Sequence, residues 1–358
     1  AGDARMLVKE LMAARVALFV GFASLARESG VAIEHFTHPV PPTQIELWIA
    51  CPHAYFVTYL LGVRPLDDPE AELEIRPNTR GDLVHDTLDE LHREVIAGVL
   101  PQPTAGWQPE HIARALELFE AQCAAYERTG RTGRPASWAV ERQMLHAELL
   151  EWFHHDSERL RARRAEIVWS EGRFGEDGDV WLPLPDGSRL AVRGRIDRVD
   201  RTASGTLVVV DHKTGKPDGY KAVLDHPTAD GTLFQLPVYA AGARALVGET
   251  DAPVEAYYSF FRRGGYAEIG YALSPDVAQA ITESLGTAVD GIRSGLYPAR
   301  PEKPGWRMFV PCDFCEPDGL GTAERWDEWE RKRRDPRGAR WFAEPADENE
   351  SETAEVAR

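Results

Sequence analysis

The sequence lacks a long uninterrupted apolar stretch. No segment reaches the run of about 18 uncharged apolar residues that a membrane-spanning helix needs, and VALFVGFASLA near the start is short. That stretch also lacks the charged leader and cleavage pattern of a secretory signal. We therefore expect a cytoplasmic protein. The 43% apolar content of 358 residues can fill the core of one large or two modest domains.

Cysteine is scarce, and a nucleotide-binding motor motif is absent. The chain has 4 cysteines, and in a cytosolic chain a CxxC such as Cys312 to Cys315 favours a metal or redox role over a structural disulfide. The Walker A pattern GxxxxGK(S/T) does not occur anywhere in the sequence. The 358 residues therefore contain no ATP-driven motor with a Walker A motif.

Net positive charge is missing as well. The chain carries 41 Lys and Arg against 58 Asp and Glu, a formal net charge of −17. Because phosphate binding favours basic surfaces, this balance argues against tight non-specific duplex binding by the chain alone. Basic clusters remain at 159–164, at 331–334 and around Arg193, Arg195 and Arg198. A basic partner or a tethered motor could supply the missing affinity.

The stretch 189–216, RLAVRGRIDRVDRTASGTLVVVDHKTGK, predicts two strands that each carry an acid. Apolar and polar residues alternate over 189–197, as in a half-buried strand, so Asp197 should point away from the apolar side. After the polar turn 201–206, the run LVVVD indicates a strand buried on both faces, which ends at Asp211.

The lysine two residues after the second acid completes this pattern. Side chains alternate along a strand, so Asp211 and Lys213 should share one side and His212 should lie opposite. Two carboxylates and oxygen ligands suit Mg2+ or Mn2+, and a lysine can stabilise charge during phosphodiester cleavage. The alternative is a β-hairpin whose acids are solvated surface residues.

Several motifs in the chain resemble, in their order, the PD-(D/E)XK nuclease domain of the RecB family. The likeness is to the nuclease domains of bacterial helicase-nucleases of the AddB/AdnB type, and it spans roughly residues 41–335. The motifs are PPTQIELWIACPHAYF at 41–56, RGDLVHDTL at 80–88, GRID at 194–197, VVVDHKTG at 208–215 and QLPVY at 235–239. The resemblance implies a restriction-endonuclease-like α/β fold, with a central mixed sheet flanked by helices and with helical insertions.

The resemblance also implies roles for individual residues. His85, Asp197, Asp211 and the backbone carbonyl of His212 would hold Mg2+ or Mn2+, and the two aspartates with Lys213 would be catalytic. A neutral imidazole can serve as such a ligand.

Further positions would support the substrate strand. Gln235 and Tyr239, four apart on a helix that begins near Phe234, share a face and could contact DNA or position the lysine. The alternative is a helix that packs on the sheet and whose polar ends are incidental. The resemblance also makes Arg80 or Gly81, in the motif of the histidine, a close-approach position near the metal or the DNA backbone, and Arg195 lies in the basic cluster at the proposed site. For Glu171 a supporting role is one interpretation, and a surface acid is the favoured one.

The cysteines match the family pattern in part. Relatives hold an iron-sulfur cluster with one cysteine before the nuclease core and three after it, and Cys51, Cys312 and Cys315 match three of these positions. Gly321 stands where the fourth is expected. A three-cysteine site with an outside ligand and a vestigial structural staple are the alternatives. Cys123 is expected on a buried helical face.

The whole pattern predicts an N-terminal helix and connector at 1–40, a nuclease domain at 41–335 and an acidic, disordered tail at 336–358. We expect a metal-dependent deoxyribonuclease, exonucleolytic on single-stranded or unwound DNA, that acts in recombination and repair at the bacterial nucleoid. The helicase motor would be another chain or a missing N-terminal region, and the opening AGDARMLVKE favours a fragment. The alternatives are a non-catalytic DNA-binding or scaffolding protein and an RNA-acting enzyme.

Overall fold

The computed structural model describes residues 36, 38–63, 74–261, 265–301, 323–334 and 341. The helix predicted near the N-terminus, the later cysteines Cys312 and Cys315 with Gly321, and nearly all of the predicted acidic tail lie outside these residues. The chain divides into two compact units. The larger comprises 38–43 and 66–285, and the smaller comprises 1–37, 44–65 and 286–358.

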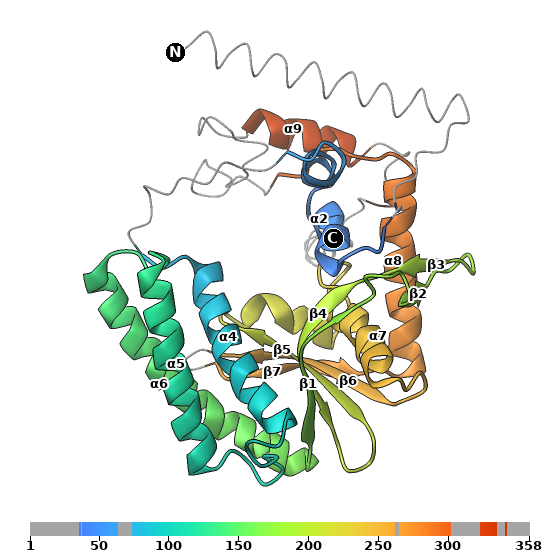
Figure 1. Cartoon of the computed structure of the whole chain (residues 1–358). Coiled ribbons are helices and arrows are strands. Elements are labelled where there is room, and N and C mark those ends of the chain that lie inside the picture. Colours follow the sequence, from blue (N-terminus) through green and yellow to red (C-terminus); the bar gives the residue numbers. More distant parts are fainter. Residues whose placement is uncertain are drawn as a thin grey trace, which may run out of the picture. The chain divides into compact units, whose positions relative to one another are not determined.

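A five-stranded mixed sheet forms the centre of the larger unit within the described residues, in the order β1-β4-β5-β6-β7 (Figure 1). β5 and β6 run parallel, and the other neighbouring pairs are antiparallel. The mixed sheet expected from the sequence is therefore confirmed. The strands are β1 (Glu166–Phe174), β4 (Gly194–Arg201), β5 (Leu207–Lys213), β6 (Val254–Phe260) and β7 (Glu268–Ala272).

The apolar run of β5 is buried on both faces, as predicted. Its residues from Leu207 to Val210 are at most 1% exposed. Parallel strands need a long crossover, and the crossover from β5 to β6 contains the short helix η3 (Asp218–Leu224) and α7 (Gln235–Val247). α7 packs against β1, β4, β5 and β6. Pro237 is accommodated because it falls in the first turn of this helix.

Helices α4 (Pro77–Ile96), α5 (Pro109–Arg128) and α6 (Pro135–Arg163) form a helical group beside the sheet. Each begins with proline, which is pre-organised for the first helical position. Figure 1 shows α4 between the sheet and α5, and the last part of α6 contacts β4 and β6 directly. The predicted apolar stripe of α4 is in the core, and Leu83, Leu88 and Leu91 are at most 1% exposed. This packing fixes which side of α4 faces the sheet.

The strand predicted over 189–197 is in fact two strands. β3 (Arg189–Ala191) pairs with β2 (Trp181–Pro183) in a separate two-stranded sheet, and β4 begins at Gly194. The prediction was wrong because the backbone between them has other partners: Val192 donates its N–H to Val180, and Arg193 donates to Val40. β4 then continues to Arg201, which shortens the predicted turn.

In the smaller unit, aromatic side chains join the segment 44–65 to the segment after 286. Trp48 Nε1 donates to the Leu296 carbonyl at 3.0 Å, and the rings of Tyr55 and Tyr297 stack with centroids 6.1 Å apart. A Cβ at Gly291 would lie 2.0 Å from the Trp48 indole, so the close approach requires glycine.

Short helices meet at the first cysteine, and one longer helix ends in this unit. As predicted, Cys51 stands between α2 (Pro42–Ala50) and α3 (Pro52–Tyr55), which is followed by η1 (Phe56–Leu60). The later helices are α8 (Pro275–Arg293) and α9 (Ala323–Lys332). Among the described residues, no helix combines the length and apolarity required to cross a membrane.

Candidate active site

His85 lies in the middle of α4 and reaches two central strands, β4 and β5. Its Nε2 lies 3.1 Å from the carbonyl oxygen of His212 in β5, and its Nδ1 lies 3.4 Å from Oδ1 of Asp197 in β4. The core residues Leu83 and Leu88 on either side of it anchor this part of the helix. The segment 80–88 therefore contacts the central strands β4 and β5.

Asp197 lies where β4 and β5 separate. The residue pairs between these strands end at Arg198 and Val210, and beyond them Asp197 Oδ2 accepts the His212 N–H at 2.6 Å. The carboxylate thus takes the place of the backbone carbonyl that would otherwise accept the His212 N–H between the two strands. The sequence predicted a half-buried strand here, which was wrong: every residue from Ile196 to Asp200 is buried.

Asp211 and Lys213 lie together at the end of β5. Asp211 is 3% exposed, and its Oδ2 forms an ion pair with Lys213 Nζ. His212, between them, packs its ring against Trp152 and Phe261, each with centroids 5.4 Å away. The acid and the lysine therefore meet each other, and the intervening imidazole enters the core.

Glu171 also reaches this site, although the sequence favoured a surface position for it. Its side chain is 9% exposed, and Oε1 lies 3.6 Å from His85 Nδ1. The backbone of Glu171 has a φ of +48°, a conformation that is costly for any residue with a side chain. Such strain is concentrated at functional sites. The strand pattern around residue 171 and the family resemblance, in which a glutamate often stands near this position, were the signals that pointed to it.

Three of these side chains bring possible metal-binding atoms together. One donor atom each from His85, Glu171 and Asp197 lies within 4.8 Å of the other two. Asp211 is outside this trio, but its charge acts on both His85 and Asp197. Imidazole nitrogen and carboxylate oxygens are ligands that divalent cations accept. We call His85, Glu171, Asp197 and Asp211 the acidic cluster.

The electrostatics of the acidic cluster fit a bound cation. Burial raises the pKa of Asp211 to about 6, although Lys213 opposes this shift. Burial also opposes ionisation of Asp197, yet the adjacent His85 holds the pKa of that carboxyl below its usual value. For His85, burial acts to lower the pKa, but Asp197 raises it well above the ordinary value. Buried carboxylates are thus crowded where a divalent ion would compensate their charge.

The sequence as a whole matches a known family. A family model described as the PD-(D/E)XK nuclease superfamily covers residues 39–318, a range that includes the entire acidic cluster. The chain belongs to this superfamily.

Relatives with curated names are 27–30% identical to this PD-(D/E)XK domain over the aligned positions. Each is named as a subunit of an ATP-dependent helicase/deoxyribonuclease. The protein of Streptococcus pneumoniae (strain Hungary19A-6) is 29% identical over 68% of this chain and 19% of its own length. That of Pelotomaculum thermopropionicum is 30% identical over 60% and 18%, and that of Acetivibrio thermocellus is 27% identical over 49% and 15%. The chain therefore spans less than a fifth of these relatives.

A solved structure is also similar to part of the chain. The crystal structure of SSO0001 covers 59% of this chain and 74% of its own, with 14% identity and a TM-score of 0.22. Likeness at that level does not bear on the fold or the function of this PD-(D/E)XK domain.

The two residues predicted from QLPVY begin α7. Gln235 is half-buried, and Tyr239 is 8% exposed. The ring of Tyr239 lies edge-on to Phe174, with centroids 6.2 Å apart, and a Cβ at Gly194 would come within 3.0 Å of it. Tyr239 therefore packs against the start of β4, three residues before Asp197. Contact of this pair with DNA stays a prediction.

The two predicted arginines have different surroundings. Arg80 contacts Glu141 at 2.6 Å, Glu148, and the Thr214 carbonyl at 3.2 Å, so it joins α4 to α6 and to the loop after β5. Arg195 is 55% exposed, and its Nε lies 2.7 Å from Glu171 Oε2. The structure thus places Arg80 within protein contacts and Arg195 at the edge of the acidic cluster.

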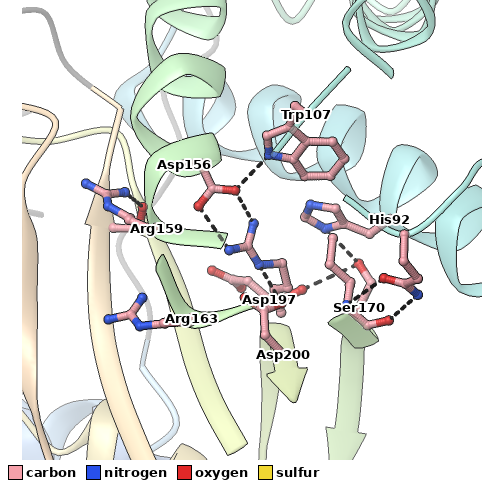
Figure 2. A network of polar contacts seen from close by, with 12 residues as sticks. His92, Trp107, Asp156, Arg159, Arg163, Ser170, Asp197 and Asp200 are labelled. Carbon is pink, nitrogen blue, oxygen red and sulfur yellow. Dashed lines mark hydrogen bonds and ion pairs between the residues drawn. The ribbon is translucent and has the colours of Figure 1, made fainter. Parts of the chain in front are cut away.

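A buried ion-pair network supports the strand that carries Asp197. Arg198 donates hydrogen bonds to both oxygens of Asp156 in α6, at 2.8 and 3.0 Å, and its Nε lies 3.0 Å from Asp200. Trp107 Nε1 donates to the same Asp156 carboxylate at 2.8 Å, as Figure 2 shows. Sequence reasoning missed this network, because nothing in the spacing of these residues indicates that they meet.

A serine links α4 to β4 beside the network (Figure 2). Ser170 Oγ donates to Asp89 at 2.8 Å and lies 3.4 Å from the Asp197 carbonyl oxygen. His92, two turns after His85 on α4, lies 3.5 Å from the same hydroxyl. Burial lowers the pKa of His92 to about 3, so this imidazole is neutral.

The described cysteines are both buried. Cys51 Sγ accepts the N–H of Arg300 at 3.4 Å, and Cys123 lies in the core on α5, as predicted. Because Cys312 and Cys315 lie outside the described residues, a cluster held by Cys51 and these two stays a prediction.

Proposed function

We propose that this chain is a metal-dependent nuclease that hydrolyses phosphodiester bonds of single-stranded or unwound DNA. The observation that carries the proposal is the convergence of the acidic cluster with Lys213 at the point where β4 and β5 separate. Membership of the PD-(D/E)XK superfamily supports the reaction class. The names of the relatives support DNA as the substrate.

His85, Asp197, Asp211 and the His212 carbonyl, joined by Glu171, would hold Mg2+ or Mn2+. A divalent ion bound there would polarise the scissile phosphate and lower the pKa of an attacking water. Asp197 is already fixed by the His212 N–H, so its ligand oxygen is pre-organised.

Lys213 acts beside this centre as a cation. Its ammonium pairs with Asp211 and lies 5.4 Å from the centroid of the Tyr258 ring. A cation held in this position orients the water and stabilises negative charge that develops on the phosphate oxygens. The reaction is thus assigned to electrostatic stabilisation rather than to a covalent enzyme intermediate.

A helicase motor is the partner that we propose. The relatives are named as parts of helicase/deoxyribonucleases, and the chain covers less than a fifth of their length. A motor in another chain or in a longer form of this one would deliver unwound strands and offset the charge of −17. We further propose exonucleolytic digestion at the bacterial nucleoid, in recombination and repair.

The test compares the purified chain with Asp211→Ala and Lys213→Ala on end-labelled single-stranded DNA with Mn2+, Mg2+ or EDTA. The proposal expects cleavage by the unaltered chain with metal only, and almost none by either variant. Equal cleavage by all three proteins would indicate a contaminant and would remove the support for catalysis. No cleavage by any of them would favour a DNA-binding or scaffolding protein.

Two further experiments define the substrate more closely. Circular single-stranded DNA should resist digestion if the enzyme is an exonuclease, and RNA should compete poorly if DNA is preferred. Rapid linearisation of the circle would contradict the exonucleolytic proposal. Iron and sulfide analysis of protein purified without oxygen tests the cluster predicted for Cys51, Cys312 and Cys315.

A further inference from the structure

A hollow lined by three arginines lies beside the acidic cluster. It has a volume of about 230 Å3 and is lined by Pro41, Arg173, Glu176, Arg193, Gly194 and Arg195. Its charged groups are three guanidinium groups and one carboxylate. In a chain with a net charge of −17, this local excess of positive charge calls for an explanation.

The fold itself gives no reason for two of these arginines to face each other. Arg173 in β1 and Arg195 in β4 are directly paired across the sheet, and like charges in such positions destabilise a sheet. The side chain of Arg173 makes no hydrogen bond or ion pair with any residue in the part of the chain that the structure describes. An anion between the two side chains would remove the repulsion.

Arg193 is held at the rim of the hollow with donors to spare. Its Nε donates to the Pro39 carbonyl at 3.0 Å, and one terminal nitrogen lies 3.5 Å from Glu176. A guanidinium has five N–H donors in a fork that matches phosphate oxygens. Most of the donors of Arg193 therefore remain available to a ligand.

The hollow adjoins the site where we expect cleavage. Arg195 contacts Glu171, which in turn contacts His85. Arg195 also precedes Asp197 by two residues along β4, a distance of about 6.6 Å in an extended strand. Neighbouring phosphates in an extended nucleic-acid strand are separated by a similar distance.

We propose that the three arginines bind the phosphate next to the scissile one in a single-stranded substrate. The proposal rests on the nuclease function and specifies how the substrate lies over β1 and β4. Arg173 and Arg193 hold one internucleotide phosphate, and Arg195 bridges that phosphate to Glu171. The strand thereby places the next phosphodiester at the acidic cluster.

Binding without metal tests this proposal separately from catalysis. A fluorescein-labelled oligothymidylate is titrated in EDTA with the unaltered chain and with Arg173→Gln/Arg193→Gln. The matched control is Arg128→Gln/Arg134→Gln, which alters two exposed arginines at the end of α5 and just before α6.

The hollow variant should bind about tenfold more weakly, since charge-assisted hydrogen bonds to a phosphate are lost. The slope of log K against log salt should decrease by about 0.7, the value for one phosphate on a single strand. The control variant should match the unaltered chain in affinity and in the slope of log K against log salt. Equal affinity of the hollow variant and the unaltered chain would overturn the proposal, whereas arginine-dependent binding without cleavage would contradict the nuclease function alone.

A single neutral methylphosphonate places the contact along the strand. With Mn2+, this linkage next to the scissile bond should slow cleavage by the unaltered chain and have little further effect on Arg173→Gln/Arg193→Gln. If the methylphosphonate and the arginine substitutions slow cleavage independently, so that their effects on the rate multiply, the arginines bind another phosphate and the assignment is overturned. Near-ultraviolet circular dichroism and thermal unfolding check that the variants fold.

Discussion

The central strands carry two buried groups of charges that are balanced in different ways. In the ion-pair network, Asp156 and Asp200 both contact Arg198, so the protein itself supplies the opposite charge. In the acidic cluster, carboxylates from β1, β4 and β5 crowd one histidine and one lysine. In the first arrangement each carboxylate has a guanidinium partner within the fold. For the second we propose a divalent cation as the balancing charge, which would distinguish a reaction centre from a supporting network.

The largest effect should follow from neutralising an acid of the cluster. Asp211→Asn should reduce cleavage by about a thousandfold or more, because a metal ion contributes several kcal/mol to the reaction. The melting temperature of Asp211→Asn should change less than that of Asp156→Ala, a variant of the ion-pair network. Single-turnover cleavage and thermal unfolding measure the two quantities. Substantial cleavage by Asp211→Asn would remove this residue from the proposed centre.

The next effect concerns stability rather than chemistry. Asp156→Ala should lower the free energy of unfolding by about 3–5 kcal/mol, because it leaves Arg198 buried without its main partner. The matched control is Glu249→Ala, which removes the exposed partner of Arg201 on the same strand and should cost about 0–1 kcal/mol. Urea unfolding measures both. Equal losses would mean that the network does not support β4 as we describe.

Acid should weaken the fold through His92. Burial holds its folded pKa near 3, whereas an unfolded histidine titrates near 6.5, so below that pH the unfolded chain binds more protons. Stability should therefore fall as pH decreases, by about 2 kcal/mol for this residue between pH 6.5 and 5. His92→Gln should show a correspondingly shallower loss in urea unfolding at several pH values. An unchanged pH slope would show that His92 is not the responsible group.

The contrast between the two groups also shows what the sequence could predict. Asp211 and Lys213 lie in one contiguous motif, and the alternation of side chains along β5 was sufficient to place them on one side. His85 was singled out by the family motif at 80–88 and not by the periodicity of α4. The meeting of Arg198 with Asp156 depends on how α6 packs against the sheet, which no local pattern specifies. Glu171 was misjudged for a related reason: neither its residue type nor the local pattern indicates a positive φ or a contact with His85.

The smallest expected effect separates charge from backbone strain at Glu171. Glu171→Gln removes the charge and keeps a side chain at a φ of +48°, whereas Glu171→Gly also relieves the strain. The Gly variant should therefore be about 1 kcal/mol more stable than the Gln variant in urea unfolding. Both should need about tenfold more Mn2+ for half-maximal cleavage, as expected when a group that tunes a metal site is lost. Equal stability of the two variants would show that the backbone at Glu171 is not strained, and an unchanged Mn2+ requirement would place its carboxylate outside the metal centre.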